Sequence, residues 1–225
     1  MLDDKGFDTW AWDYDESVRR SENNDEYPFA GYGKVLGFIY NKMRGSDKAH
    51  YEIDRHRERE SGNGKSVLDI GFGTGLLTSR LYENGYAVTG MDFSEAMINI
   101  AAEKMPEARL MQWDFSKGMP KKLEDSRFDF IVSTYALHHL RDSEKIDFLN
   151  SLKSYLKPEG IILIGDVSFE TREKLEACKE KNAPDWDEDE YYFVYNEIKG
   201  SLEFKSKAYI PFSHCGGVLV LSQTG

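Results

Sequence analysis

From Ser66 onward, short apolar runs alternate with segments whose apolar residues recur every three to four positions. The runs have the length and content of buried strands, and they cover residues 67–70, 87–91, 109–113, 128–134 and 160–167. The segments between them predict helices at about 75–84, 94–104, 142–156 and 170–181. Regular alternation of strand and helix predicts right-handed crossovers and a parallel sheet with helices on both faces.

The last forty residues depart from this alternation. A helical pattern near residues 188–199 precedes two strand-like runs at 202–210 and 218–222, which a turn at 213–217 joins. Two strands without a helix between them predict an antiparallel hairpin at one edge of the sheet. We therefore expect residues 66–225 to form a doubly wound α/β core with a mostly parallel, seven-stranded sheet and an antiparallel C-terminal hairpin edge.

The first 44 residues are rich in aromatic side chains and precede this core. Helical spacing of apolar residues is found at Phe7, Trp10, Tyr14 and Val18, and a second helical pattern runs from about Pro28 to Met43. We expect residues 1–44 to form a helical lid over a pocket, with Tyr14 near the reacting group. Packing against the core is the more frequent use of such an aromatic stripe, so both interpretations stay open. Residues 45–65 are polar and charged, which predicts a solvated connector.

Composition limits the class of protein. The chain has 225 residues, of which 31% are charged and 40% hydrophobic, as expected of a water-soluble globular domain. The formal net charge of −11 makes a small molecule a better expected substrate than nucleic acid. With neither a bilayer-length apolar run nor a basic, apolar leader at Met1, we expect a cytoplasmic protein without a membrane partner. Two cysteines far apart in sequence predict neither a disulfide scaffold nor a four-ligand zinc site.

The sharpest motif is the sequence Val-Leu-Asp-Ile-Gly-Phe-Gly-Thr-Gly at residues 67–75. A strand that ends in closely spaced glycines can turn tightly and bring its backbone against a ligand. The spacing of Gly71, Gly73 and Gly75 differs from the dinucleotide fingerprint, whose third glycine would stand at Leu76, and a phosphate-binding Gly-Lys-Ser/Thr ending is absent. Asp69 inside the apolar strand suits a cationic ligand better than a pyrophosphate, although a buried, hydrogen-bonded structural Asp is the alternative.

Two further acids follow the next two predicted strands. Asp92, about 20 residues beyond the glycine loop, can accept hydrogen bonds from both hydroxyls of a ribose. Asp114 stands at the end of the third strand, where its carboxylate could accept a hydrogen bond from an adenine amino group. The alternative for Asp92 is a solvated acid at a strand end, and for Asp114 an Asp that starts a turn.

Taken together, residues 69–75, Asp92, Asp114 and the Phe-Asp-Phe-Ile-Val strand at 128–132 resemble class I S-adenosylmethionine-dependent methyltransferases over about residues 66–169. Residues 7–15 and 133–140 resemble, more narrowly, small stand-alone bacterial methyltransferases of unassigned substrate. The resemblance implies that the three glycines line the amino-acid end of the cofactor, that Asp92 holds its ribose and that Asp114 reads its adenine. The cofactor-binding residues that we predict are Asp69, Gly71, Gly73, Gly75, Asp92, Phe93, Asp114, Phe115 and Ser133.

Transfer of a methyl group from a sulfonium ion mainly requires alignment of the reacting atoms and exclusion of water. A base is needed only where the acceptor must lose a proton. Candidates follow the fourth strand: Tyr135 would line the methyl-transfer pocket, and either His138 or His139 could serve as a base. The alternative is that both histidines begin a helix and merely satisfy core contacts.

Several absences narrow the reaction further. Residues 133–136 read Ser-Thr-Tyr-Ala and differ from the Asn/Asp-Pro-Pro-aromatic motif of enzymes that methylate exocyclic amino groups of nucleic acids. No Pro-Cys dipeptide supplies the nucleophile of cytosine C5 methylation. Asp166 is a lone acid at the end of the fifth strand that could help to shape the pocket, so we predict no metal site. The acidic run at 185–192 is interpreted as a solvated loop and helix start, with a cationic substrate contact as the alternative.

The function we expect is methyl transfer from S-adenosylmethionine to a small-molecule acceptor by in-line displacement. One alternative is a non-catalytic, cofactor-binding regulatory protein. The other is a nicotinamide-dependent oxidoreductase, against which Leu76 and Asp69 argue. The sequence leaves the acceptor and the oligomeric state open.

Overall fold

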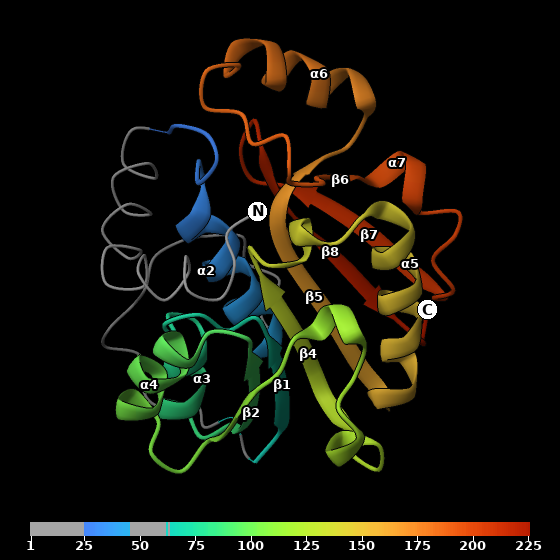
Figure 1. Cartoon of the computed structure of the whole chain (residues 1–225). Coiled ribbons are helices and arrows are strands. Elements are labelled where there is room, and N and C mark those ends of the chain that lie inside the picture. Colours follow the sequence, from blue (N-terminus) through green and yellow to red (C-terminus); the bar gives the residue numbers. More distant parts are fainter. Residues whose placement is uncertain (1–24, 46–61, 63) are drawn as a thin grey trace.

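The computed structural model describes residues 25–45, 62 and 64–225, and Figure 1 shows a central sheet flanked by helices. Across these residues the sheet has eight strands in the order β3-β2-β1-β4-β5-β8-β7, with the short β6 beside β5. The strands are β1 (Ser66–Ile70), β2 (Ala87–Asp92), β3 (Arg109–Gln112), β4 (Phe128–Thr134), β5 (Leu156–Phe169), β6 (Phe193–Val194), β7 (Ser206–Pro211) and β8 (Gly216–Ser222). Strands β1 to β5 are parallel, whereas β8 runs antiparallel to both β5 and β7. The predicted parallel sheet with an antiparallel C-terminal hairpin is thereby confirmed.

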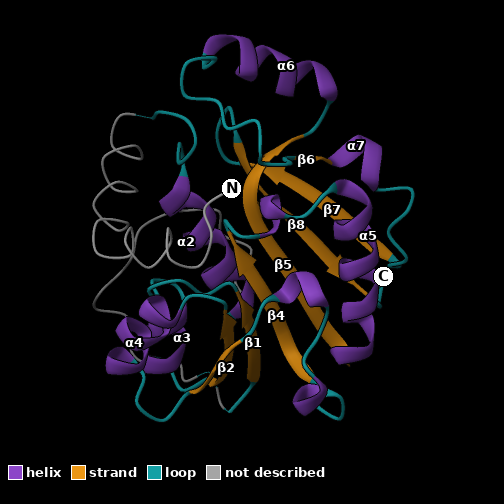
Figure 2. Ribbon diagram, viewed as in Figure 1, coloured by secondary structure: helices purple, strands orange, loops and turns teal. Residues whose placement is uncertain are grey.

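The helices occupy the segments between the strands, as the periodicity predicted (Figure 2). They are α2 (Tyr32–Met43), α3 (Thr78–Glu83), α4 (Glu95–Lys104), α5 (Asp142–Ser151), α6 (Arg172–Lys181) and α7 (Tyr195–Ile198). Short 3-10 turns lie at Phe115–Lys117, Lys121–Leu123, Leu137–His139 and Leu152–Tyr155. The turn at Leu152–Tyr155 completes the segment predicted as one helix over 142–156. The helix predicted at about 75–84 begins only at Thr78, because the turn after the glycine loop precedes it.

Two hydrophobic cores lie on opposite faces of the sheet. Alternate residues of a strand point to opposite faces, so neighbours in one strand belong to different cores. Val67 contributes to the core under α2, α3 and α4, while Leu68 contributes to the core under α5 and α7. The same alternation separates Phe130 from Ile131 in β4. Both faces are therefore covered, which explains why these strands read as continuous apolar runs.

Helix α2 packs directly against the sheet. Its residues Val35, Ile39 and Met43 are almost fully buried, and Val35 lies over Gly165 of β5. A Cβ atom placed on Gly165 would come within 2.4 Å of Val35 Cγ1, so the glycine permits the close approach of the helix. The first predicted helix, which includes Tyr14, lies outside the described residues, as does most of the 45–65 connector. The predicted lid and the division into three segments stay predictions.

The helix predicted over 188–199 is wrong for most of its length. Residues 193–194 form β6, which pairs in parallel with the end of β5, and only Tyr195–Ile198 are helical. Tyr192, Phe193 and Val194 are all buried. Three consecutive buried residues cannot lie on one face of a helix, so the demand for burial in the tertiary structure overrides the local helical pattern.

None of the helices in the described ranges combines the length and apolar character needed to cross a bilayer. Cys178 and Cys215 are both buried free thiols.

Candidate active site

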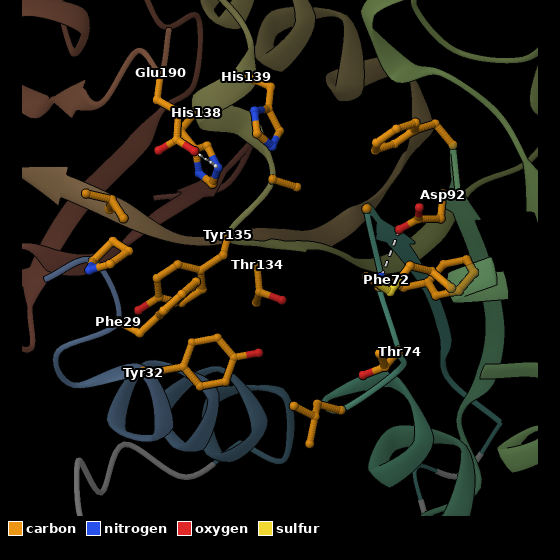
Figure 3. Close-up of a pocket in the computed structure, with 18 of the residues that line it drawn as sticks. Phe29, Tyr32, Phe72, Thr74, Asp92, Thr134, Tyr135, His138, His139 and Glu190 are labelled. Carbon is orange, nitrogen blue, oxygen red and sulfur yellow. Dashed lines mark hydrogen bonds and ion pairs between the residues drawn. The ribbon is translucent and has the colours of Figure 1, made fainter. Parts of the chain in front are cut away.

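A pocket opens at the carboxyl ends of the parallel strands, where the loops after β1, β2, β4 and β5 meet. Among the described residues its lining includes Pro28, Phe29, Tyr32, Gly71, Phe72, Gly73, Thr74, Asp92, Phe93, Met97, Phe115, Thr134, Tyr135, Ala136, His138, His139, Val167, Asp187, Asp189 and Glu190. Figure 3 shows Asp92 and Phe72 on one side of this pocket and His138, His139 and Glu190 on the other, with Thr134 and Tyr135 between them. Predicted cofactor-binding residues and predicted catalytic residues therefore line the same cavity.

The glycine loop depends on its glycines for two different reasons. Gly71, Gly73 and Gly75 all have positive φ angles, of 69°, 57° and 82°. A Cβ atom on Gly71 would stand 2.5 Å from Ala136 Cβ, so this glycine allows the loop to touch the segment after β4. A Cβ atom on Gly75 would meet α4 at 3.1 Å from Met105 Cε. Gly71 and Gly73 line the pocket, whereas Gly75 supports helix packing behind it.

Asp92 ties the glycine loop to the end of β2. Its Oδ2 accepts a hydrogen bond from the backbone N–H of Gly73 at 2.8 Å, and its Oδ1 accepts one from Ser94 N–H at 3.0 Å. Ser94 in turn caps α4 by accepting a hydrogen bond from Met97 N–H at 3.2 Å. The carboxylate is thereby held at the pocket edge, where Phe93 stands beside it.

Besides Gly75, three of the predicted cofactor residues lie outside the pocket lining. Asp69 is buried beneath the loop, and its Oδ2 accepts a hydrogen bond from Thr78 Oγ1 at 2.6 Å. Ser133 donates its hydroxyl proton to the carbonyl oxygen of Ile70 at 2.8 Å. Asp114 accepts hydrogen bonds from the backbone N–H and hydroxyl of Ser116 at 3.0 and 2.6 Å, so it acts as a turn cap. Direct cofactor contact by these three stays a prediction, whereas Phe115 does line the pocket.

Tyr135 adopts an unusual backbone conformation at the centre of the pocket. Its φ angle is 51°, a left-handed value that costs energy for a residue with a side chain, and its N–H donates to Gly165 O at 2.8 Å. The ring lies against two aromatic neighbours, with centroid distances of 5.5 Å to Phe29 and 4.7 Å to Tyr32. Residues from two separate segments thus form an aromatic wall. Tyr14, predicted for the same region, lies outside the described residues.

His138 is held by a buried carboxylate. Its Nδ1 lies 2.6 Å from Asp166 Oδ1, which also accepts a hydrogen bond from Val167 N–H at 2.8 Å. On the other side of the ring, Nε2 lies 3.5 Å from Glu190 Oε1. Burial by itself lowers the pKa of His138, but the carboxylates of Asp166 and Glu190 outweigh it, so the pKa is raised. Asp166, expected only to shape the pocket, fixes the orientation of this imidazole.

His139 and Glu190 complete the cluster. Burial, together with the neighbouring His138, lowers the pKa of His139 to about 3, so this imidazole is neutral near pH 7. One ligand-type atom from each of His138, His139 and Glu190 lies within 4.8 Å of the other two. Glu190 Oε2 accepts a hydrogen bond from Tyr192 OH at 2.7 Å. The sequence analysis did not identify Glu190. Its one indication was the alternative interpretation of residues 185–192 as a contact for a cationic substrate.

Lys145 was also missed, because a lysine on an amphipathic helix is normally solvated. It is fully buried, and its ammonium donates hydrogen bonds to the carbonyl oxygen of Tyr191 and to Asp142 Oδ1, the latter at 3.2 Å. Tyr191 N–H donates to His138 O at 2.8 Å. These contacts fix the segment that carries Glu190 against the histidine turn.

Comparison with known proteins identifies relatives of the chain. A family model described as a methyltransferase domain matches residues 67–160. The chain is 31% identical over 204 residues to an uncharacterized methyltransferase of Oceanobacillus iheyensis, an alignment that covers 88% of this chain and 85% of the relative. It is 34% identical over 194 residues to an uncharacterized methyltransferase of Geobacillus thermodenitrificans, with 83% and 80% covered.

Solved structures share the fold at lower identity. Magnesium protoporphyrin IX methyltransferase from Synechocystis PCC 6803, solved with bound SAH, superposes with a TM-score of 0.61 at 16% identity, covering 85% of this chain and 83% of that chain. A TehB-like SAM-dependent methyltransferase from Corynebacterium glutamicum superposes with a TM-score of 0.56 at 18% identity, covering 94% and 97%.

Proposed function

The chain belongs to the class I S-adenosylmethionine-dependent methyltransferases, and from this premise we propose that it methylates a small-molecule acceptor by in-line displacement. The observation that carries the proposal is the shared cavity, whose lining includes Gly73, Asp92 and Tyr135. Asp92 lies on one side of it and His138 on the other (Figure 3). A methyl donor bound on the first side would present its reactive carbon toward the second. The chemistry that the cofactor supplies is a methyl group on a positively charged sulfur, which leaves as a neutral thioether.

The described residues fit this cofactor in charge and in shape. The lining contains the carboxylates of Asp92, Asp187, Asp189 and Glu190 and, among the described residues, neither lysine nor arginine. Such a lining suits a ligand that carries a sulfonium and an ammonium group and disfavours the pyrophosphate of a nicotinamide dinucleotide. Gly73 presents open space where a Cβ atom would stand, so a ligand can approach the backbone there.

Each residue of the cofactor side takes a distinct role in the proposal. Asp92 accepts hydrogen bonds from the ribose hydroxyls, and Gly71 and Gly73 line the amino-acid end. Phe93 and Phe115 enclose the adenine, which is planar and apolar on its faces. Asp69, Gly75 and Ser133 support the loop and strands from beneath, through the contacts described above. Ser116 binds Oδ1 of Asp114, so Oδ2, which lies 3.2 Å from Lys117 Nζ, is the oxygen left to accept from the adenine amino group.

The acceptor side suits a molecule with an apolar body and one nucleophilic heteroatom. Phe29, Tyr32 and Tyr135 offer an aromatic surface that aligns the body and keeps water away from the reacting atoms. His138 stands where the heteroatom would lie, and its Asp166 partner favours the tautomer with a lone pair on Nε2. That lone pair can accept a proton when the acceptor has one to lose.

The test is calorimetric titration with S-adenosylhomocysteine of the wild type, Asp92→Asn and a control variant, Asp125→Asn. Asp125 is an exposed acid away from the pocket. Because hydrogen bonds to a charged group contribute about 1.5–3 kcal/mol, we expect Asp92→Asn to weaken binding roughly 10- to 100-fold and the control to leave it unchanged. Micromolar binding of NAD in its place would contradict the proposal. Release of S-adenosylhomocysteine in a screen of small thiols, hydroxyl compounds and amines would then identify the acceptor class.

A further inference from the structure

His138, His139 and Glu190 are arranged as a set of metal ligands. His138 Nε2 and Glu190 Oε1 are separated by 3.5 Å, and one ligand-type atom of each of the three residues lies within 4.8 Å of the others. Two tetrahedral ligands at about 2.0–2.1 Å from a zinc ion stand about 3.4 Å apart. One pair therefore already has the separation that an ion requires, and a ligand-type atom of His139 lies within 4.8 Å of the other two residues.

Two of the three ligands are oriented by a second hydrogen bond. Asp166 binds Nδ1 of His138 at 2.6 Å, which leaves Nε2 directed toward Glu190. Tyr192 OH binds Oε2 of Glu190 at 2.7 Å, which leaves Oε1 directed toward His138. A carboxylate behind a ligating histidine is the usual support of a metal-binding imidazole, since it fixes the tautomer and the ring orientation. The carboxylate of Asp166 is almost fully buried, so its position is not a chance surface contact.

The pocket around the cluster carries carboxylates that can attract a cation. When Nδ1 carries the proton that Asp166 accepts, Nε2 is an acceptor, and it then faces the carboxylate oxygen of Glu190, which is also an acceptor. Asp187 and Asp189 line the same pocket. The nearby ammonium of Lys145 is bound to Asp142 and to the Tyr191 carbonyl. A cation seated between Nε2 and Oε1, which lie 3.5 Å apart, would meet one acceptor on each side.

We propose that His138, His139 and Glu190 bind one divalent transition-metal ion, for which Zn²⁺ is the best match, at the acceptor end of the pocket. Two imidazoles and a carboxylate form the ligand set of catalytic zinc sites that keep one position open, and imidazole disfavours Mg²⁺ and Ca²⁺. The sequence predicted no metal because Asp166 was a lone acid at a strand end. Glu190 stands about 50 residues from the histidines, and only the fold brings the three residues together.

The open coordination position of the ion indicates which class of acceptor could bind there. This inference rests on the proposed function. An acceptor thiol or acidic hydroxyl that binds the ion loses its proton to solvent, because the ion stabilises the anion. The bound sulfur or oxygen then forms its bond to the methyl carbon, while the bond from that carbon to the cofactor sulfur breaks and leaves its electron pair on sulfur. His138 acts as a ligand here, which excludes its use as a base, since both roles employ the Nε2 lone pair.

The experiment uses the full chain, freed of metal with a chelator and titrated with Co²⁺ as a visible probe, followed by competition with Zn²⁺. We expect one Co²⁺ per chain, displaced by Zn²⁺, with the absorption intensity of a four- or five-coordinate site. His139→Ala and Glu190→Gln are expected to weaken binding at least 10-fold. Asp166→Asn, which alters the orientation of a ligand, should weaken it roughly 10- to 100-fold.

Exposed residues of the same types as the proposed ligands provide matched controls. Glu188→Gln removes an exposed carboxylate two residues from Glu190, and His214→Ala removes an exposed imidazole. Both should bind Co²⁺ as the wild type does. Binding that is absent from the wild type, or equally strong in Glu190→Gln and Glu188→Gln, overturns the metal site and leaves His138 as a proton acceptor.

Titration of every sample with S-adenosylhomocysteine separates the two proposals. Cofactor binding without metal binding contradicts the metal site alone, whereas loss of both in the wild type contradicts the proposed function. Circular dichroism and thermal unfolding that match the wild type show that His139→Ala and Glu190→Gln are folded. Weaker Co²⁺ binding by these variants is then due to the loss of a metal ligand and not to unfolding.

Discussion

The carboxylate of Asp92 and the backbone N–H of Gly73 are joined by a hydrogen bond of 2.8 Å, which links the tip of β2 to the turn after β1. The side chain expected to hold the ribose therefore also positions the backbone expected to meet the amino-acid end of the cofactor. Because both groups face the same cavity, changes in the loop should affect binding without a comparable effect on folding.

Gly73→Ala is expected to separate binding from stability. The φ angle of 57° makes alanine unfavourable by about 1–2 kcal/mol, and the new methyl group would enter open pocket space. Gly45→Ala is the matched control, because Gly45 has a φ angle of 76° and no neighbour among the described residues within 4 Å of a Cβ atom. Urea unfolding should show similar losses for the two variants, and calorimetry should show weaker S-adenosylhomocysteine binding for Gly73→Ala alone. Equal affinity of the two variants for S-adenosylhomocysteine would mean that the cofactor does not bind against Gly73.

The contact between Gly165 and Val35 predicts a coupled pair. Gly165→Ala would bring a methyl group within 2.4 Å of Val35 Cγ1, and such overpacking costs about 1–3 kcal/mol. Val35→Ala removes the clash at the cost of a small cavity. The double variant should therefore lose less stability than the sum of the single variants, by at least about 0.5 kcal/mol in a double-mutant cycle. Strict additivity in urea unfolding would mean that α2 does not rest on β5.

The buried ammonium of Lys145 predicts an unusual sensitivity for a lysine. Lys145→Met keeps the length of the side chain but leaves the carbonyl of Tyr191 without this donor, which costs about 1–3 kcal/mol. Lys153→Met is the control, because the Lys153 ammonium meets Glu203 near the surface at 3.2 Å and such pairs contribute only about 0–1 kcal/mol. Thermal unfolding of both variants measures the difference. Equal losses would show that the ammonium does not hold the 191 segment.

The sequence predicted the sheet well because its strands are buried on both faces. Val67, Leu68 and their counterparts in β4 and β5 must be apolar whichever way they point, and this constraint is visible in the sequence without knowledge of partners. The segment from Asp187 to Val194 was harder to predict, because its conformation depends on pairing with β5 and on Lys145.

The convergence of predicted residues in one pocket could be foreseen where those residues stand at strand ends. Gly71, Gly73, Asp92 and Tyr135 stand at strand ends, and parallel strands bring their carboxyl ends to one edge, so their meeting could be foreseen. Glu190 joins His138 through a loop far along the chain, which no local pattern indicates. Asp114 was assigned from its position at a strand end, but the side chain can also satisfy its own turn, as the contacts with Ser116 illustrate.

Asp69 predicts a pH dependence of stability. Burial raises the pKa of Asp69 from 3.8 to about 7 against the opposing effect of Thr78, and Oδ1 has no hydrogen-bond partner among the described residues. The folded state thus retains a proton that the unfolded state releases near pH 4. The contribution of Asp69 to the free energy of unfolding is therefore unaffected below about pH 4, falls as the pH rises toward 7, and stays low above it.

Asp69→Asn should remove this dependence, because the amide keeps an acceptor for Thr78 Oγ1 and does not ionise. The difference in unfolding free energy between Asp69→Asn and the wild type should shift in favour of the variant between pH 4 and pH 8, by at most about 4 kcal/mol. Urea unfolding across this range measures it, with the exposed Asp125→Asn as a control that should show little change. A constant difference would mean that Asp69 ionises in the folded chain as readily as in the unfolded one. In that case a donor outside the described contacts stabilises its carboxylate, because the Thr78 hydroxyl alone cannot offset the burial of a full charge.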